Sequence, residues 1–308
     1  MTNPTMFFSQ PTVIDHAYID QEGRVVGGSF NPDFLVTGEI DPKEKVVIDF
    51  GTGKKQIKAL IDHKEFGYDH KLWIIPGFSN AEYDRLENDR IKITTPVCEL
   101  GGPIDMIRVC EVARDYSTAE IGQELQAFLT RELGKQHPGI KVEVHNSTTA
   151  HVFRDARPMV FFRYVHGLKN STSWGCQQPS HGHLSFLQAE PEVWEPFDVG
   201  MGTGGQIEAL LHQIRKAVDN AIFVWDENID FNKSNGEWIA IDYTTAARGR
   251  FTCKYLNSAF NIVVLPHETT VELLAEYIEE RWGPELQKAG VKQLFVSEGL
   301  SKGAVICL

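Results

Sequence analysis

Apolar and polar positions along the first part of the chain follow two different periods. Strand-like alternation and short apolar runs, bounded by turn residues, predict strands at 11–18, 34–40 and 45–50. The apolar positions of 53–66 instead follow helical spacing, and we expect that helix to end near Gly67. The alternation of the two periods predicts a mixed α+β fold.

The same pattern recurs 150 positions later. The motif QIKALI at 56–61 is matched by QIEALL at 206–211, and DHKLW at 69–73 is matched by DNAIF at 219–223. A repeat of this length indicates a duplicated structural unit.

The ends of the two copies also correspond. Each has a Thr-x-Glu sequence, which is typical of a helix N-terminus, before a helix and a final strand. The helices are predicted from Thr118 to near Gly134 and from Thr270 to near Gly283, and the strands begin near 139 and 290. Each copy has an added strand pair between its two helices, at 91–95 with 105–109 and at 238–243 with 260–265. We expect two packed units, 1–152 and 153–308, joined near 154–158.

Composition narrows the class of protein. Of the 308 residues 42% are hydrophobic and 23% are charged, which is ordinary for a globular protein, and no apolar run is long enough for a membrane span. The first ten residues lack the pattern of a signal peptide, so we expect a cytoplasmic protein. A net charge of −12 argues against a nucleic-acid partner and favours a small molecule. Five scattered cysteines without a CxxC motif indicate reduced thiols.

Three histidines predict a metal centre. His181 and His183 share one face of an extended strand, and the alternating segment 160–166 brings His166 alongside them across a hairpin. Three imidazoles without a fourth protein ligand are typical of a zinc site that keeps one position open. The alternative is a turn that carries two solvated histidines.

The two copies differ in complementary ways. The first copy has Gly27–Phe30 in place of the His-Gly-His motif, whereas the second copy has Asp219-Asn220 in place of Asp69-His70. A carboxylate-bound imidazole is a general acid or base, and Cys176 is a thiol that zinc and a histidine would activate. A single site would therefore span both units and would suit proton abstraction next to an oxygenated carbon. The alternative is random loss in one copy, which would leave Asp69-His70 as a surface pair.

These residues resemble the 6-pyruvoyltetrahydropterin synthase / 6-carboxytetrahydropterin synthase family. The likeness covers most of the chain as two copies and is most specific in Cys176-x4-His181-Gly-His183 after His166. It extends to Phe162-x3-His166, Asp49-Phe50, Asp69-His70, Thr270-x-Glu272 and Glu298. The resemblance implies the tunnelling fold, in which units with antiparallel sheets and helices on one face assemble side by side into a barrel.

The resemblance also implies a role for each residue. His166, His181 and His183 would hold Zn²⁺, Cys176 would be the catalytic thiol, Asp69 and His70 would be the acid/base pair, and Glu298 and Thr270 would bind substrate. Glu298 would anchor the pterin ring of 7,8-dihydroneopterin triphosphate, and the product would be a 6-carboxy- or 6-pyruvoyl-tetrahydropterin of the queuosine, biopterin or folate pathway. The alternatives are a surface carboxylate at 298 and a simple helix cap at 270.

The implied protein is a homo-oligomeric lyase with no nucleic-acid or membrane partner, and three double units would complete a six-unit particle. Two other functions stay open. One is a related lyase that cleaves a pterin side chain by a retro-aldol route. The other is an inactive oligomer that binds zinc and pterin.

Overall fold

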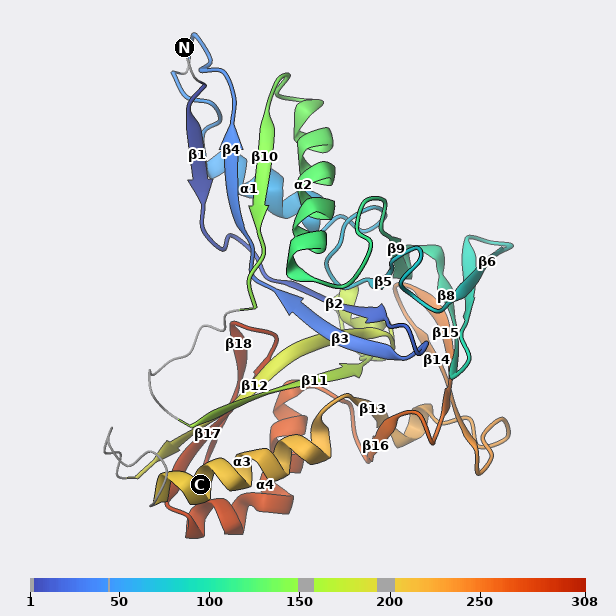
Figure 1. The fold of residues 1–308 in the computed structure, drawn as a ribbon. Coiled ribbons are helices and arrows are strands. Elements are labelled where there is room, and N and C mark those ends of the chain that lie inside the picture. Colours follow the sequence, from blue (N-terminus) through green and yellow to red (C-terminus); the bar gives the residue numbers. More distant parts are fainter. Residues whose placement is uncertain (1–2, 44, 149–157, 193–202) are drawn as a thin grey trace.

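The computed structural model describes residues 3–43, 45–148, 158–192 and 203–308. Within these ranges the chain forms eighteen strands and four α-helices, so the predicted α+β class is confirmed. Figure 1 shows one pair of helices at the top and one at the bottom, with sheets between them. None of the helices described combines the length and the apolar character that crossing a bilayer requires. The predicted boundary at 152/153, and the joint near 154–158 except Pro158, lie outside the described residues.

The first half is built on one long, bent hairpin. Strands β2 and β3 pair at one end of it, and β1 and β4 pair at the other. The sheet orders are β3-β2-β5-β9 and β1-β4-β10. The elements are β1 (Thr5–Phe8), β2 (Ile14–Ile19), β3 (Val25–Phe30), β4 (Asp33–Thr37), α1 (Phe50–Ile61), β5 (Leu72–Ile74), β9 (Ile107–Val109), α2 (Thr118–Gly134) and β10 (Lys141–His145).

The second half repeats this order in one continuous sheet, β16-β13-β11-β12-β17-β18. Strands β11 and β12 take the place of the bent hairpin, and β13 joins β11 in parallel as β5 joins β2. The elements are β11 (Met159–His166), β12 (His181–Pro191), α3 (Thr203–Val218), β13 (Ala221–Trp225), β16 (Asn261–Leu265), α4 (Val271–Lys288), β17 (Val291–Glu298) and β18 (Lys302–Cys307). Strand β18 is an addition to the pattern of the first half.

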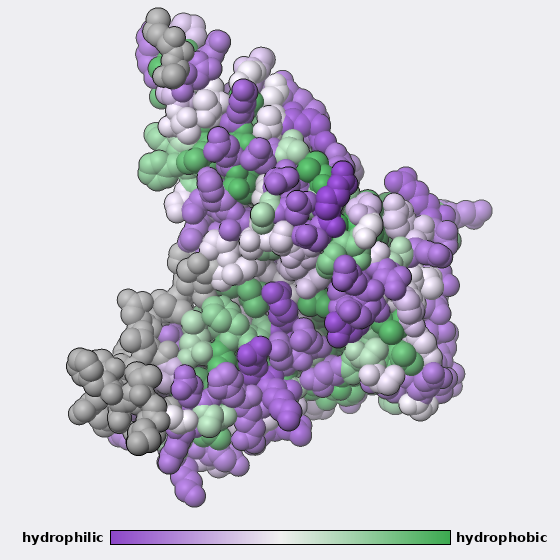
Figure 2. Space-filling view, viewed as in Figure 1, coloured by the Kyte–Doolittle hydropathy of each residue, from purple (hydrophilic) through white to green (hydrophobic). Residues whose placement is uncertain are grey.

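Three apolar cores follow from the alternation of side chains along the strands. Trp73 of β5 faces the core beneath α1 and α2, whereas its neighbours Leu72 and Ile74 face a central core. In the same way Phe223 of β13 faces the core beneath α3 and α4, and Ile222 faces the central core. The halves therefore pack sheet against sheet, with their helices outermost. Figure 2 shows this side of the molecule as largely hydrophilic with scattered hydrophobic patches.

A third sheet links the halves at one end. Its order is β14-β15-β8-β7-β6, and β15 of the second half pairs antiparallel with β8 of the first. The strands are β6 (Glu82–Leu86), β7 (Arg90–Thr94), β8 (Cys98–Pro103), β14 (Trp238–Thr245) and β15 (Gly249–Leu256). Three 3₁₀ turns, η1 (Ile104–Met106), η2 (Gly175–Gln177) and η3 (Asp226–Asn228), complete the described elements. The predicted strand pairs were therefore wrong: 91–95 and 238–243 lie in this shared sheet, whereas 105–109 and 260–265 contribute β9 and β16 to the sheets of their own halves.

Several predicted boundaries were wrong for local reasons. No strand forms at 45–50, because the Asp49 carboxylate accepts a hydrogen bond from the Thr52 amide at 2.8 Å and caps α1. That helix ends at Ile61, ahead of the predicted Gly67. Helix α4 continues past Gly283 to Lys288, because Leu286 is fully buried in the core.

Candidate metal and thiol site

Strand pairing places the three histidines on one face of the six-stranded sheet of the second half. His166 lies opposite His181, and Tyr164 lies opposite His183, so all three imidazoles point the same way. Their nearest ligand atoms lie within 4.8 Å of one another, and the Nε2 atoms of His166 and His183 are 3.2 Å apart. All three side chains are buried.

Two of the imidazoles are oriented by backbone carbonyls. His166 Nδ1 lies 2.7 Å from the Thr269 oxygen, and His181 Nδ1 lies 3.1 Å from the Gln178 oxygen. A carbonyl only accepts hydrogen bonds, so each Nδ1 carries the proton and each Nε2 keeps its lone pair. Burial lowers the pKa of His166 to about 3 and the pKa of His181 well below its usual value, which keeps both rings neutral.

The third imidazole lies beside a carboxylate of the other half. His183 Nδ1 lies 3.3 Å from Oδ1 of Asp15, which is itself buried. Burial disfavours the charged form of Asp15, but His183 and Lys302 lower its pKa overall. Asp15 also accepts a hydrogen bond of 2.5 Å from the Ser29 hydroxyl.

These donors fit a divalent cation such as Zn²⁺. Two neutral imidazoles and a carboxylate-backed third converge in a buried place, and Nε2 of His181 has no hydrogen-bond partner in the described part of the chain. A buried polar atom without a partner is costly, and a metal ion would satisfy it. The geometry is thus that of a three-histidine metal site.

The Asp69-His70 pair comes from the first half and reaches this site. His70 Nδ1 lies 2.5 Å from Asp69 Oδ2, and Asp69 Oδ1 accepts a hydrogen bond from the Asp15 amide at 2.9 Å. His70 has a left-handed backbone with φ of 52°, a conformation that non-glycine residues rarely adopt. Burial opposes protonation of His70, but Asp69 and Cys176 raise its pKa well above its usual value.

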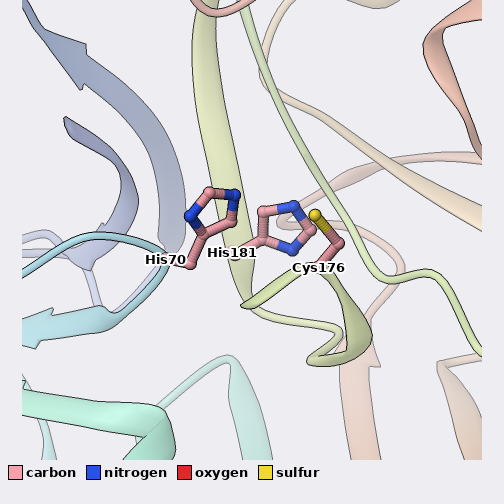
Figure 3. Close-up of side chains that lie close together, drawn as sticks. All are labelled: His70, Cys176 and His181. Atoms are coloured by element: carbon pink, nitrogen blue, oxygen red, sulfur yellow. The ribbon is translucent and has the colours of Figure 1, made fainter. Parts of the chain in front are cut away.

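Cys176 lies in η2, in the loop between β11 and β12. Its thiol, an imidazole nitrogen of His70 and one of His181 lie within 4.8 Å of one another. Figure 3 shows His70 and Cys176 on either side of the His181 ring. A Cβ at Gly175 would lie 2.6 Å from the His70 ring, so only glycine permits this approach of the two halves. One chain therefore brings the three histidines, the Cys176 thiol and the Asp69-His70 pair together.

The loop that carries Cys176 is fixed by a residue that the sequence analysis missed. The Arg248 guanidinium lies 3.8 Å from the centroid of the Trp174 ring, and Lys71 Nζ lies 4.9 Å from the same centroid. Arg248 Nη2 lies 2.6 Å from Oδ1 of Asp105, a residue of the first half. The Tyr243 hydroxyl donates to the Gln177 carbonyl at 2.8 Å. The sheet β14-β15-β8-β7-β6, which we call the linking sheet, thus holds the loop that carries Cys176, which we call the thiol loop.

The two residues predicted to bind substrate have different surroundings. Glu298 ends β17, with Oε1 3.9 Å from Nε2 of both His166 and His183 and Oε2 3.1 Å from Lys302 Nζ. Thr270 instead caps α4, where its hydroxyl accepts from the Leu273 amide at 3.5 Å. It is the carbonyl of the preceding Thr269 that contacts a site histidine. Substrate binding by Glu298 and Thr270 stays a prediction.

No family model matches the sequence, and no curated protein matches it. Among solved structures, the fold is similar to 6-pyruvoyltetrahydropterin synthase of Plasmodium vivax, with 20% identity and a TM-score of 0.37 over 48% of this chain and 92% of that one. The synthase of Plasmodium falciparum is similar at 19% identity and a TM-score of 0.35, over 47% of this chain and 91% of that one. The chain therefore resembles these synthases over about half its length, and the assignment of its site rests on the geometry described above.

Proposed function

We propose that this protein is a zinc-dependent, pterin synthase-like lyase that acts on 7,8-dihydroneopterin triphosphate. The product would be a 6-carboxy- or 6-pyruvoyl-tetrahydropterin. The observation that carries the proposal is the convergence of Cys176 and Asp69-His70 on the three-histidine cluster, from opposite halves of one chain. In this proposal the halves are two tandem tunnelling-fold units, and the enzyme is cytoplasmic.

The metal-holding role belongs to Nε2 of His166, His181 and His183. A bound Zn²⁺ would supply Lewis-acid polarisation of the oxygen atoms of the substrate side chain. Asp15 keeps the third imidazole oriented, and the carbonyls of Thr269 and Gln178 orient the other two.

Proton transfer belongs to the thiol and the acid/base pair. The Cys176 thiolate takes a carbon-bound proton from the substrate side chain, and the adjacent His70 imidazolium stabilises that thiolate. Asp69 holds His70 by the 2.5 Å contact at Nδ1, so the opposite nitrogen faces the site and relays protons. That nitrogen, Nε2, is buried without a hydrogen-bond partner among the described residues.

Recognition of the pterin ring belongs to Glu298. One oxygen of its carboxylate is paired with Lys302, and the other faces the histidine cluster. A carboxylate in this position accepts hydrogen bonds from the aminopyrimidine edge of a pterin. Thr270, at the start of α4, would contribute to the same side of the site.

The test compares Cys176→Ala and His70→Asn with the wild type. We expect turnover of 7,8-dihydroneopterin triphosphate to fall by about 10²-fold or more in both, because each variant removes a proton-transfer group. Zinc content should stay near one per chain, because neither residue belongs to the three-histidine cluster. Cys307→Ala is the control, since that thiol is exposed on β18. Unchanged turnover in Cys176→Ala would contradict this mechanism, and product analysis would distinguish a retro-aldol lyase.

A second candidate is a zinc- and pterin-binding protein without turnover. The observation that favours it is the short distance of 3.9 Å between Glu298 Oε1 and two of the histidine Nε2 atoms. A carboxylate this close would compete with substrate for the open position on the cation. Zinc bound at one per chain, with pterin binding but no product, would support this second function.

A further inference from the structure

A cavity of about 510 Å³ lies between the two halves, away from the histidine cluster. Its wall combines aromatic rings, amides and three arginines. The residues that matter here are Tyr18, Arg24, Val26, Phe161, Arg163, Arg215, Asp219, Asn220 and Phe260.

Strand register identifies this cavity as the counterpart of the metal site. Ala17 of β2 lies opposite Leu72 of β5, and Val165 of β11 lies opposite Ile222 of β13, so Ala17 and Val165 are equivalent positions in the two halves. In the hairpins these two residues face Gly27 and Gly182. Counting outward from them, Tyr18, Val26 and Gly28 stand where the other half has His166, His181 and His183. The counterpart of the His-Gly-His motif is therefore 26–28, and the predicted 27–30 was wrong by register.

The acid/base pair has its counterpart in the same cavity. Asn220 has a left-handed backbone with φ of 54°, as His70 has with 52°. Asp219 Oδ1 accepts a hydrogen bond from the Arg163 amide at 2.9 Å, as Asp69 Oδ1 does from the Asp15 amide. Arg163 therefore occupies the position of Asp15, and a cation replaces the anion that backs the metal site.

The cavity does not offer the ligands of a three-histidine metal site. A Cβ at Gly28 would lie 2.1 Å from the Tyr116 hydroxyl, so Tyr116 fills the space that a third ligand would need. Tyr18 stacks on Tyr116 with ring centroids 3.5 Å apart. The cavity has space for a ligand, but no histidine stands at the three positions that correspond to His166, His181 and His183.

The charges that remain favour an anion. Arg24 is paired with Asp20 at 2.8 Å, and Arg215 is paired with Asp219 at 3.4 Å. Arg163 donates to the Gly27 carbonyl at 2.6 Å, and in the part of the chain that the structure describes no carboxylate lies within 4.0 Å of it. Arg163 also shares a hydrogen bond with the Tyr116 hydroxyl. A guanidinium carries five N–H donors in a plane, so donors remain for a ligand.

We propose that this cavity binds a small aromatic molecule that carries a phosphate group. Arg163 holds the phosphate, because guanidinium and phosphate oxygens match in a two-bond geometry. Phe161 and Phe260 provide apolar wall for the ring of the ligand. The cavity has neither metal ligands nor a histidine at position 220, so it binds the ligand without transforming it.

Calorimetric titration of the purified full-length protein with phenyl phosphate tests this proposal. We expect saturable binding that weakens at least about tenfold in Arg163→Gln, because the anion loses its guanidinium partner. Arg250→Gln is the matched control, since it removes an exposed guanidinium that does not line the cavity, and we expect it to leave the affinity unchanged.

A second variant tests the proposal independently, in case Arg163→Gln fails to fold. Asn220→Asp keeps the size of the side chain and tolerates a left-handed backbone, but it adds a negative charge to the cavity. We expect it to weaken phenyl phosphate binding as well. Absence of saturable binding to the wild type, or unchanged affinity in both cavity variants, would overturn the proposal. Turnover is not measured, so failure here is separate from failure of the proposed enzyme.

Discussion

His16 is a fully buried histidine of the first half that lies outside the metal cluster. Its ring stacks on Trp73 with centroids 3.7 Å apart, and its Nε2 atom lies 2.8 Å from the Tyr116 hydroxyl. Burial lowers the pKa of His16 to about 3, against the weaker upward effects of the Ile14 carbonyl and Asp15. His16 is therefore neutral in the folded protein over the physiological range.

Replacement of His16 tests this pKa through stability. Between pH 6.5 and about 3 the unfolded chain binds a proton at His16 that the folded chain does not, so the free energy of unfolding falls as the pH drops. In His16→Phe the loss of stability between pH 7.5 and pH 5 should be smaller than in the wild type by about 2 kcal/mol. Urea unfolding at the two pH values measures it. An equal loss in both proteins would show that His16 is protonated in the folded state.

At the residue scale, sequence reasoning named the side chains that the structure brings together and missed the groups that orient them. His166, His181, His183, Cys176 and Asp69-His70 stand out as motifs with a known use for each residue type. The supporting groups have no such signal: Thr269 and Gln178 act through backbone carbonyls. Asp15 reaches His183 only because the sheets of the two halves pack against each other.

At the element scale, the linking sheet controls the thiol loop through Arg248. The Arg248 side chain is almost fully buried, between the Trp174 ring and Asp105. In Arg248→Gln we expect turnover to fall about tenfold or more with zinc content unchanged, because the loop loses its fixed position and not its metal. Alkylation of Cys176, followed by mass spectrometry, should become faster. Arg248→Lys should restore part of the turnover.

Arg250→Gln provides the matched control for this prediction. Arg248 lies in the turn before β15, whereas Arg250 lies in β15 and pairs with Asp242 at the surface. Its replacement should change neither turnover nor the alkylation of Cys176. If both variants behave alike, the linking sheet has a general structural role and does not position the thiol.

Predictability of the elements depended on whether the local pattern agreed with the tertiary contacts. Helix α2 runs from Thr118 to Gly134 as predicted, because its cap, its amphipathic pattern and its end agree. Strand β15 was missed although it forms a local hairpin with β14, because 238–243 was paired with the apolar segment 260–265 instead. The strand predicted at 45–50 failed because one capping carboxylate outweighed a short apolar run.

At the scale of the whole molecule, the duplication was predictable but the packing of the copies was not. A spacing of 150 residues between matched motifs is visible in the sequence. The contact between the sheets depends on glycines: a Cβ at Gly182 would lie 2.6 Å from the Cα atom of Gly27. Sequence patterns specify which face of a strand is apolar, and they do not specify which other sheet that face meets.

The six-stranded sheet ends in two edge strands, β16 and β18, and the assembly that we propose from family analogy would use them. Val264 on β16 and Val305 on β18 are 45% and 48% exposed, so each open edge presents an apolar side chain. Pairing of these edges between chains would bury both valines and would remove the open edges, as in a closed barrel. We therefore expect three chains, each with two units, to form the particle.

Light scattering of the wild type and of Val305→Lys tests this assembly. The wild type should have the mass of three chains of 34.7 kDa each, and the variant should shift toward the monomer. A lysine on an edge strand opposes pairing, because its charge would have to leave water. Phe231→Lys is the control, since Phe231 is 74% exposed and follows η3, outside the sheet edges. A stable wild-type monomer would contradict the trimer, and it would leave the site intact, because every residue of that site lies within one chain.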